Sequence, residues 1–170
     1  MYVAHYGFKG RPFQLVPDPR FFFASRAHRE ALADLVRALS AAEGLMLLVG
    51  PVGVGKTMLV DYLLAELGSA HFKIGRLALR RAMSESLGPA ILESFGEPPH
   101  KGSARAWRRR LARFLKARAK ARRRVLLVID EAQNLEPAGL EELRALIVED
   151  LGLDGVASIV TDGAIAGLYH

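Results

Sequence analysis

The fold is decided by residues 45–64, which read LMLLVGPVGVGKTMLVDYLL and contain three kinds of segment in succession. The first, 45–49, is a continuous apolar run of strand length that is bounded by glycine. The second, 50–57, is rich in glycine and ends in Lys56 and Thr57. The apolar residues that follow at helical spacing are Met58, Leu59, Tyr62, Leu63 and Leu67. The stretch therefore predicts a strand, a loop and a helix in that order.

The loop matches the pattern G-x-x-x-x-G-K-[ST] in the strand–loop–helix context that this pattern requires, and we call residues 50–57 the P-loop. Its glycines allow backbone N–H groups to wrap phosphate oxygens, helped by the positive end of the following helix. Lys56 would reach the β- and γ-phosphates of ATP, and Thr57 would place its hydroxyl on Mg²⁺. A glycine-rich turn that binds nothing is the alternative. The residues expected to bind nucleotide are Gly50, Pro51, Val52, Gly53, Val54, Gly55, Lys56, Thr57 and Met58.

Two carboxylates follow the most apolar strand of the chain, within VLLVIDE at 125–131. Ligands of an open parallel sheet bind at the carboxyl ends of its strands, which can bring Asp130 beside the P-loop. We expect Asp130 to hold Mg²⁺, usually through water, and Glu131 to polarise the water that attacks the γ-phosphate, with Lys56 as the second catalytic residue. Consecutive Asp and Glu favour hydrolysis over transfer to a small acceptor. Two solvated carboxylates at a strand end are the alternative.

Other polar residues are candidates for contact with the nucleotide. Thr161 and Asp162 follow a strand expected at about 156–160, where they could contact the γ-phosphate or form a turn. Asn134 could make a similar polar contact or cap a helix. The histidines without metal-ligand spacing, expected to be structural or surface residues, are His28, His71 and His100.

Strands and helices alternate along the chain, which implies an α/β fold with a mainly parallel sheet covered on both faces. Strands are expected at 45–49, within 72–79, at 125–129 and at about 156–160. The helices are expected from Ser25 to near Gly44, after the P-loop, within 84–95, across the basic segment 103–124 and from Pro137. We divide the chain into a lead-in, 1–24, packed on the body, and a core, 25–170.

Positive charge is concentrated in one segment. Residues 101–124 hold 12 of the 24 Lys and Arg residues and none of the 18 acidic ones. Apolar residues at helical spacing lie between the basic ones, and Ser103 is a plausible N-cap, so the segment predicts an amphipathic helix. The basic side can be a solvated outer face, a gatekeeper against aggregation, or a surface for nucleic acid phosphate or anionic membrane. The apolar residues of this helix are Trp107, Leu111, Phe114 and Leu115.

The overall composition is that of one globular domain, with 170 residues, 51% hydrophobic and 25% charged. The chain has no Cys, which excludes disulfides, thiolate metal sites and thiol nucleophiles. Its longest apolar runs, 45–49 and 125–129, are far shorter than the roughly 20 residues that span a bilayer. The N-terminal residues lack the features of a secretory signal peptide, so we expect a cytoplasmic protein.

Three segments together resemble one family. They are MYVAHYGFKGRPFQLVPDPRFFFASRAHREAL at 1–32, the P-loop, and VLLVIDEAQNLEPAGLEELRAL at 125–146. The sequence is similar to the AAA+ ATPases of the general secretion pathway protein A (ExeA-type) family. This resemblance implies an oligomerising ATPase with its Walker A motif at 50–57 and its Walker B motif at Asp130 and Glu131. Family members couple ATP use to envelope assembly, so homo-oligomers and secretion or pilus assembly proteins are the implied partners.

The resemblance ends near residue 147. The family continues with two strands, the first ending in a GQPEL-like segment, and a helical lid that carries a nucleotide-sensing arginine, whereas 147–170 match poorly. We therefore expect a P-loop NTPase of AAA+ type, a three-layer sandwich with four strands instead of five, truncated and lacking the lid. Two other functions stay open. One is a DNA-binding ATPase regulator similar to the transposition ATPases, with DNA on the basic helix of 101–124. The other is a nucleotide-binding scaffold with little turnover.

Overall fold

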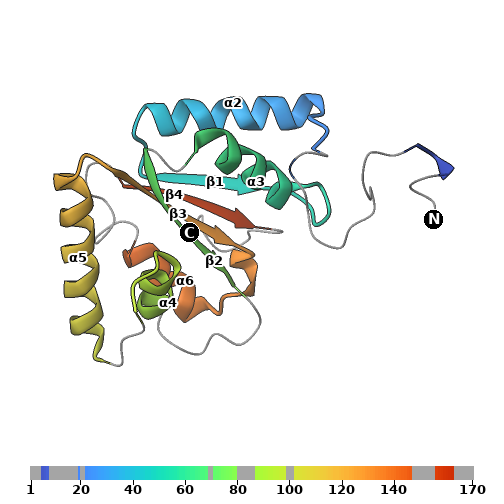
Figure 1. Cartoon of the computed structure of the whole chain (residues 1–170). Helices are drawn as coiled ribbons and strands as arrows, with labels where there is room; N and C mark the ends of the chain where they lie inside the picture. The colour runs from blue at the N-terminus through green and yellow to red at the C-terminus, as the bar shows by residue number, and fades with distance from the viewer. Residues whose placement is uncertain are drawn as a thin grey trace.

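The computed structural model describes residues 5–7, 19, 22–68, 71–79, 87–98, 102–146 and 156–162. In these ranges one sheet lies between two layers of helices (Figure 1). The strands are β1 (Leu45–Val49), β2 (Phe72–Ala78), β3 (Arg124–Asp130) and β4 (Val156–Asp162). The helices are α2 (Arg26–Ser40), α3 (Lys56–Leu67), α4 (Leu87–Ser94), α5 (Ala104–Lys120), the 3₁₀ helix η2 (Ala132–Asn134) and α6 (Pro137–Ala145).

All strand pairs are parallel, and the strand order is β1-β4-β3-β2. The carboxyl ends of the strands therefore meet at one edge, where Val49 pairs with Asp162 and Ala78 with Asp130. The expected parallel α/β sheet is confirmed. Among the described residues, β1 pairs with β4 on one side and with no strand on the other.

Side-chain alternation along β3 decides which layer its last residue faces. Leu127 and Ile129 pack with apolar residues of α4 and α5, whereas Leu126 and Val128 pack with those of α2 and α3. Since side chains of a strand repeat every second residue, Asp130 lies on the same face as Val128. The carboxylate therefore faces α3, the helix that follows the P-loop.

Several predicted boundaries differ from the structure. Helix α2 ends at Ser40 instead of near Gly44, and α4 begins at Leu87, with 84–86 outside the described residues. Strand β4 continues through Thr161 and Asp162, so these two residues do not form a turn. The strand is longer than predicted because both residues pair with β1.

The basic helix is confirmed as α5, and Ser103 stands at its N-cap, although its hydroxyl makes no capping bond. Most of the lead-in, and everything after Asp162, lie outside the described residues. Within the lead-in, Phe22 is half-buried and Phe23 is exposed. In the part of the chain that the structure describes, no helix combines the length and the apolar character needed to cross a bilayer.

Candidate active site

The P-loop folds back between β1 and α3, and its glycines make this path possible. Gly53 and Gly55 have φ values of 86° and 92°, in the left-handed region where a side chain is strained. Lys56 begins α3, and its Nζ donates to the carbonyl oxygens of Gly50 at 2.8 Å and Pro51 at 3.0 Å. The first N–H groups of α3 have no intrahelical acceptor and carry the positive end of the helix dipole. The loop therefore surrounds a place suited to an anion.

A histidine on α2 forms a hydrogen bond to the P-loop, a contact that the sequence did not predict. His28 Nε2 lies 2.8 Å from the carbonyl oxygen of Val54, and its Nδ1 lies 2.8 Å from Ser25 Oγ. Because a carbonyl oxygen only accepts, Nε2 carries the proton. A Cβ atom at Gly55 would lie 3.2 Å from His28 Nε2, so glycine also permits this close approach. His28 is therefore a structural residue, as expected, but one that contacts the candidate site.

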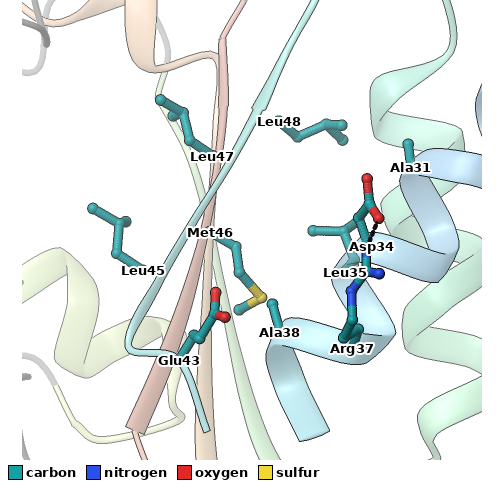
Figure 2. Close-up of a pocket in the computed structure, with 10 residues that line it drawn as sticks. All are labelled: Ala31, Asp34, Leu35, Arg37, Ala38, Glu43, Leu45, Met46, Leu47 and Leu48. Carbon is teal, nitrogen blue, oxygen red and sulfur yellow. Dashed lines mark hydrogen bonds and ion pairs between the residues drawn. The ribbon is translucent and has the colours of Figure 1, made fainter. Parts of the chain in front are cut away.

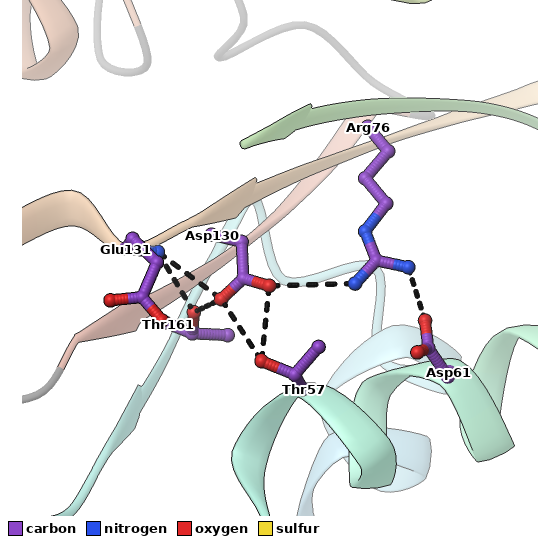
Figure 3. A network of polar contacts seen from close by, with 6 residues as sticks. All are labelled: Thr57, Asp61, Arg76, Asp130, Glu131 and Thr161. Atoms are coloured by element: carbon purple, nitrogen blue, oxygen red, sulfur yellow. Dashed lines mark hydrogen bonds and ion pairs between the residues drawn. The ribbon is translucent and has the colours of Figure 1, made fainter. Parts of the chain in front are cut away.

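The Asp130 carboxylate is the centre of a polar network at the end of β3 (Figure 3). Asp130 is 7% exposed. Thr57 Oγ1 donates to its Oδ2 at 3.1 Å, and the backbone N–H of Glu131 donates to its Oδ1 at 3.1 Å. The buried hydroxyl of Thr161 also donates to Oδ1, and Arg76 Nη2 lies 3.4 Å from Oδ2. The structure thus brings Thr57 and Asp130 together, as the sequence predicts for a magnesium site.

Glu131 leaves this buried network and faces solvent. Its backbone is left-handed, with φ 63° and ψ 42°, a conformation that strains any residue except glycine. Its carboxylate accepts a hydrogen bond from Gln133 Nε2. A cavity of about 250 Å³ brings Glu131 together with P-loop residues. The lining residues are Val52, Gly53, Gly55, Lys56, Thr57, Met58, Glu131 and Gln133.

Thr161 and Asn134, the other polar candidates, have different contacts. Thr161 is 1% exposed and bonds to Asp130, so its hydroxyl belongs to the carboxylate network. Asn134 does not cap α6: its Nδ2 donates to the carbonyl oxygen of Leu79 at 2.9 Å, directly after β2. Asn134 therefore ties η2 to the end of β2.

A larger cavity, of about 400 Å³, lies away from the P-loop between α2 and β1 (Figure 2). Met46 and Leu48 point toward α2, and the ion pair of Asp34 with Arg37 lies on the helix side. This cavity runs along the edge of β1 that pairs with no described strand. Its lining contains neither P-loop residues nor Asp130 or Glu131, so the smaller cavity is the candidate site.

Comparison with known proteins agrees with the parallel α/β fold. The sequence profile of the family described as "AAA domain" matches residues 36–157. General secretion pathway protein A of Aeromonas hydrophila is 35% identical over 147 residues, which cover 86% of this chain and 27% of that protein. The chain thus spans about a quarter of the length of this curated relative.

Solved structures share the fold at low sequence identity. The ADP form of the Aeropyrum pernix ORC2 protein has a TM-score of 0.60 and 18% identity, over 91% of this chain and 45% of that one. PCH-2 of C. elegans has a TM-score of 0.56 and 18% identity, over 86% and 40%. Drosophila ORC bound to DNA has a TM-score of 0.58 and 17% identity, over 83% and 41%. At such identities these likenesses concern the fold alone.

Proposed function

Since the chain belongs to the AAA+ P-loop NTPases of the general secretion pathway protein A type, we propose that it binds ATP with Mg²⁺ and hydrolyses it. One observation supports this most strongly. The Thr57 hydroxyl at the start of α3 meets the Asp130 carboxylate at the end of β3, and Glu131 lies in the same cavity as Lys56. This combination supports the proposal because an anion-binding loop, two oxygen ligands for a hard cation and an exposed base would then lie side by side.

The loop residues can receive the phosphates without a change of fold. The unpaired N–H groups at the start of α3 would donate to phosphate oxygens. Lys56 Nζ now donates to two carbonyl oxygens of its own loop, and it can exchange these for phosphate oxygens. The Thr57 hydroxyl and the Asp130 carboxylate fit Mg²⁺, which prefers oxygen ligands and, when bound, neutralises charge on the phosphates.

Glu131 is the proposed general base. Its carboxylate is exposed in the cavity and positioned by Gln133. It would accept a proton from a water molecule as the water oxygen bonds to the γ-phosphorus and the bond from that phosphorus to the bridging oxygen breaks. Asp130 is unsuited to this role because it is buried and accepts hydrogen bonds from several donors.

The relative's name supports a finer proposal. We propose that the protein drives assembly of a secretion or pilus envelope complex from the cytoplasm and works as a homo-oligomer. Residues 1–24 then form a lead-in on the body, and 25–170 form the ATPase core. The support is similarity to a protein named for the general secretion pathway, of which this chain spans 27%.

Calorimetric titration of ATP with Mg²⁺ tests the site itself. We expect Lys56→Ala to weaken ATP binding about tenfold or more, because it removes the ammonium group that can exchange the loop carbonyls for phosphate oxygens. Glu131→Gln should bind like the wild type, since the proposed base acts on water and not on the phosphates. Lys116→Ala, an exposed lysine on α5, is the matched control and should not change the affinity. Equal affinity of Lys56→Ala and the wild type would contradict the proposal.

A second candidate function has its own observation, the outer face of α5. Trp107, Leu111, Phe114 and Leu115 are buried against the sheet layer. No large apolar side chain is exposed between residues 105 and 120. Because nothing apolar is available to enter a bilayer, this face suits the phosphates of nucleic acid better than a membrane. The exposed basic residues of α5 and the turn after it are Arg105, Arg108, Arg109, Arg113, Lys116, Lys120, Arg122 and Arg123.

Fluorescence anisotropy with labelled duplex DNA over a series of salt concentrations tests this candidate. The triple variant Arg109→Glu, Arg113→Glu, Lys116→Glu should lower the affinity and reduce the salt slope by about one unit per lost phosphate contact. The control is Arg26→Glu with Arg37→Glu, two exposed arginines of α2 on the other face of the sheet. Equal slopes for the triple variant and the wild type would eliminate DNA binding through α5.

A further inference from the structure

Arg76 on β2 joins the candidate site to a second carboxylate, Asp61 on α3. Residues 72 and 74 of β2 pack with the α2 and α3 layer, and alternation places Arg76 on the same face. Its guanidinium lies between the two carboxylates (Figure 3). Nη1 pairs with Asp61, and Nη2 lies 3.4 Å from Asp130 Oδ2.

The charges around Asp130 make Arg76 distinctive. The other hydrogen bonds to this carboxylate come from two hydroxyls and a backbone N–H, all neutral. Lys56 donates to loop carbonyl oxygens instead. Among the described residues, Arg76 is therefore the basic side chain that forms an ion pair with Asp130. The side chain of Asp130 is 10% exposed and that of Asp61 is 17% exposed. Solvent therefore screens the ion pairs of Arg76 with these carboxylates less than it screens a pair at the surface.

Arg76 and Thr57 contact the same carboxylate oxygen of Asp130. Thr57 Oγ1 lies 3.1 Å from Asp130 Oδ2, the same oxygen that Arg76 approaches. A cation held between Thr57 and Asp130 would therefore lie near a guanidinium of like charge, which disfavours both. Asp61 offers the guanidinium a second partner of opposite charge.

We propose that Arg76 is the counter-ion of Asp130 in the metal-free protein and competes there with Mg²⁺, while Asp61 retains the guanidinium when Mg²⁺ takes Asp130. Arg76 is then a positioning residue that sets how strongly metal binding promotes nucleotide binding. The inference rests on the proposed function, because it concerns the magnesium site of the same ATPase.

The test measures the dissociation constant of a fluorescent ADP analogue, once in EDTA and once with saturating Mg²⁺. The dissociation constant in EDTA divided by the one in Mg²⁺ reports the coupling between metal and nucleotide, and a larger ratio means stronger coupling. Arg76→Gln should raise this ratio about fivefold, because the competing charge is lost. Asp61→Asn should lower it about threefold, because Arg76 then pairs with Asp130 alone and a negative charge is lost. Arg76→Lys and the surface control Arg37→Gln should stay within about twofold of the wild type.

Opposite signs for the two substitutions distinguish this role from a structural one, in which both variants would disturb the site in the same direction. A ratio that is unchanged or lowered in Arg76→Gln would overturn the inference. If the wild type binds no nucleotide, the proposed function fails, and Mg²⁺ alone still tests Arg76. The rise in thermal midpoint from EDTA to Mg²⁺ should then be larger for Arg76→Gln than for the wild type, and an equal or smaller rise would overturn the inference.

Discussion

Thr57 and Asp130 are 73 residues apart in the chain, yet Thr57 Oγ1 lies 3.1 Å from Asp130 Oδ2. The contact exists because α3 starts at the P-loop and β3 presents its last residue on the α3 face. It brings together a hydroxyl and a carboxylate, two oxygen ligands that the proposed Mg²⁺ would use.

Removing the Thr57 hydroxyl should weaken the effect of Mg²⁺ on nucleotide binding. Thr57→Val keeps the shape of the side chain and removes the hydroxyl that contacts Asp130. We expect the tightening of nucleotide binding by Mg²⁺ to fall about tenfold, measured with the fluorescent ADP analogue in EDTA and in Mg²⁺. Thr57→Ser retains the hydroxyl and should retain most of the tightening. Equal tightening in Thr57→Val and the wild type would contradict a role for this hydroxyl.

The left-handed backbone at Glu131 should make glycine more stable there than alanine, although both substitutions remove the proposed base. Glu131→Gly and Glu131→Ala both remove the carboxylate, but only glycine adopts a φ of 63° without strain. We expect the free energy of unfolding of Glu131→Gly to exceed that of Glu131→Ala by about 1 kcal/mol. Urea denaturation of both variants measures this difference. A less stable glycine variant would show that the position is not strained.

Removal of the His28 ring should loosen the P-loop. His28→Ala loses the hydrogen bond to the Val54 carbonyl oxygen, so the loop must be ordered by the nucleotide itself. We expect ATP to bind about tenfold more weakly by calorimetric titration. The free energy of unfolding should change by less than the free energy of ATP binding. His71→Ala, at an exposed histidine before β2, is the control and should bind ATP normally. Unchanged affinity in His28→Ala would mean that the bond does not support the loop.

The core behind the site should not tolerate a methyl group at Gly88. A Cβ atom there would lie 2.1 Å from the ring of Trp107, the one tryptophan of the chain. Gly88→Ala would favour a helix elsewhere, but here we expect the free energy of unfolding to fall by about 1–3 kcal/mol. Trp107 fluorescence should shift at the same time, because the indole must move. Gly44→Ala, where a Cβ atom meets nothing within 4 Å, should change neither quantity.

Local patterns were sufficient to predict most of the fold. The apolar runs at 45–49 and 125–129 are strands, and their end residues meet at one edge because parallel strands end together. The strand-end rule also indicated that Asp130 could lie beside the P-loop, and in the structure Asp130 contacts Thr57 of that loop. These predictions needed only the period of the side chains and the direction of the strands.

Contacts between distant residues could not be predicted in this way. Arg76 and Asp130 are separated by 54 residues, and His28 and Val54 by 26, with no motif that links either pair. The segment at 161–163 has the composition of a turn, yet Thr161 and Asp162 pair with β1, so tertiary pairing prevailed over local propensity. The left-handed backbone of Glu131 likewise depends on the surrounding structure and not on its side chain.

The rate of phosphate release from ATP with Mg²⁺ tests most directly whether the P-loop, Asp130 and Glu131 form an ATPase site. The wild type should release phosphate, and Glu131→Gln should do so about a hundredfold more slowly because the general base is lost. Glu136 is an exposed glutamate five residues after Glu131, so Glu136→Gln is the control and should release phosphate as fast as the wild type. A Glu131→Gln variant as fast as the wild type, or a wild type that binds ATP and releases no phosphate, would contradict the account.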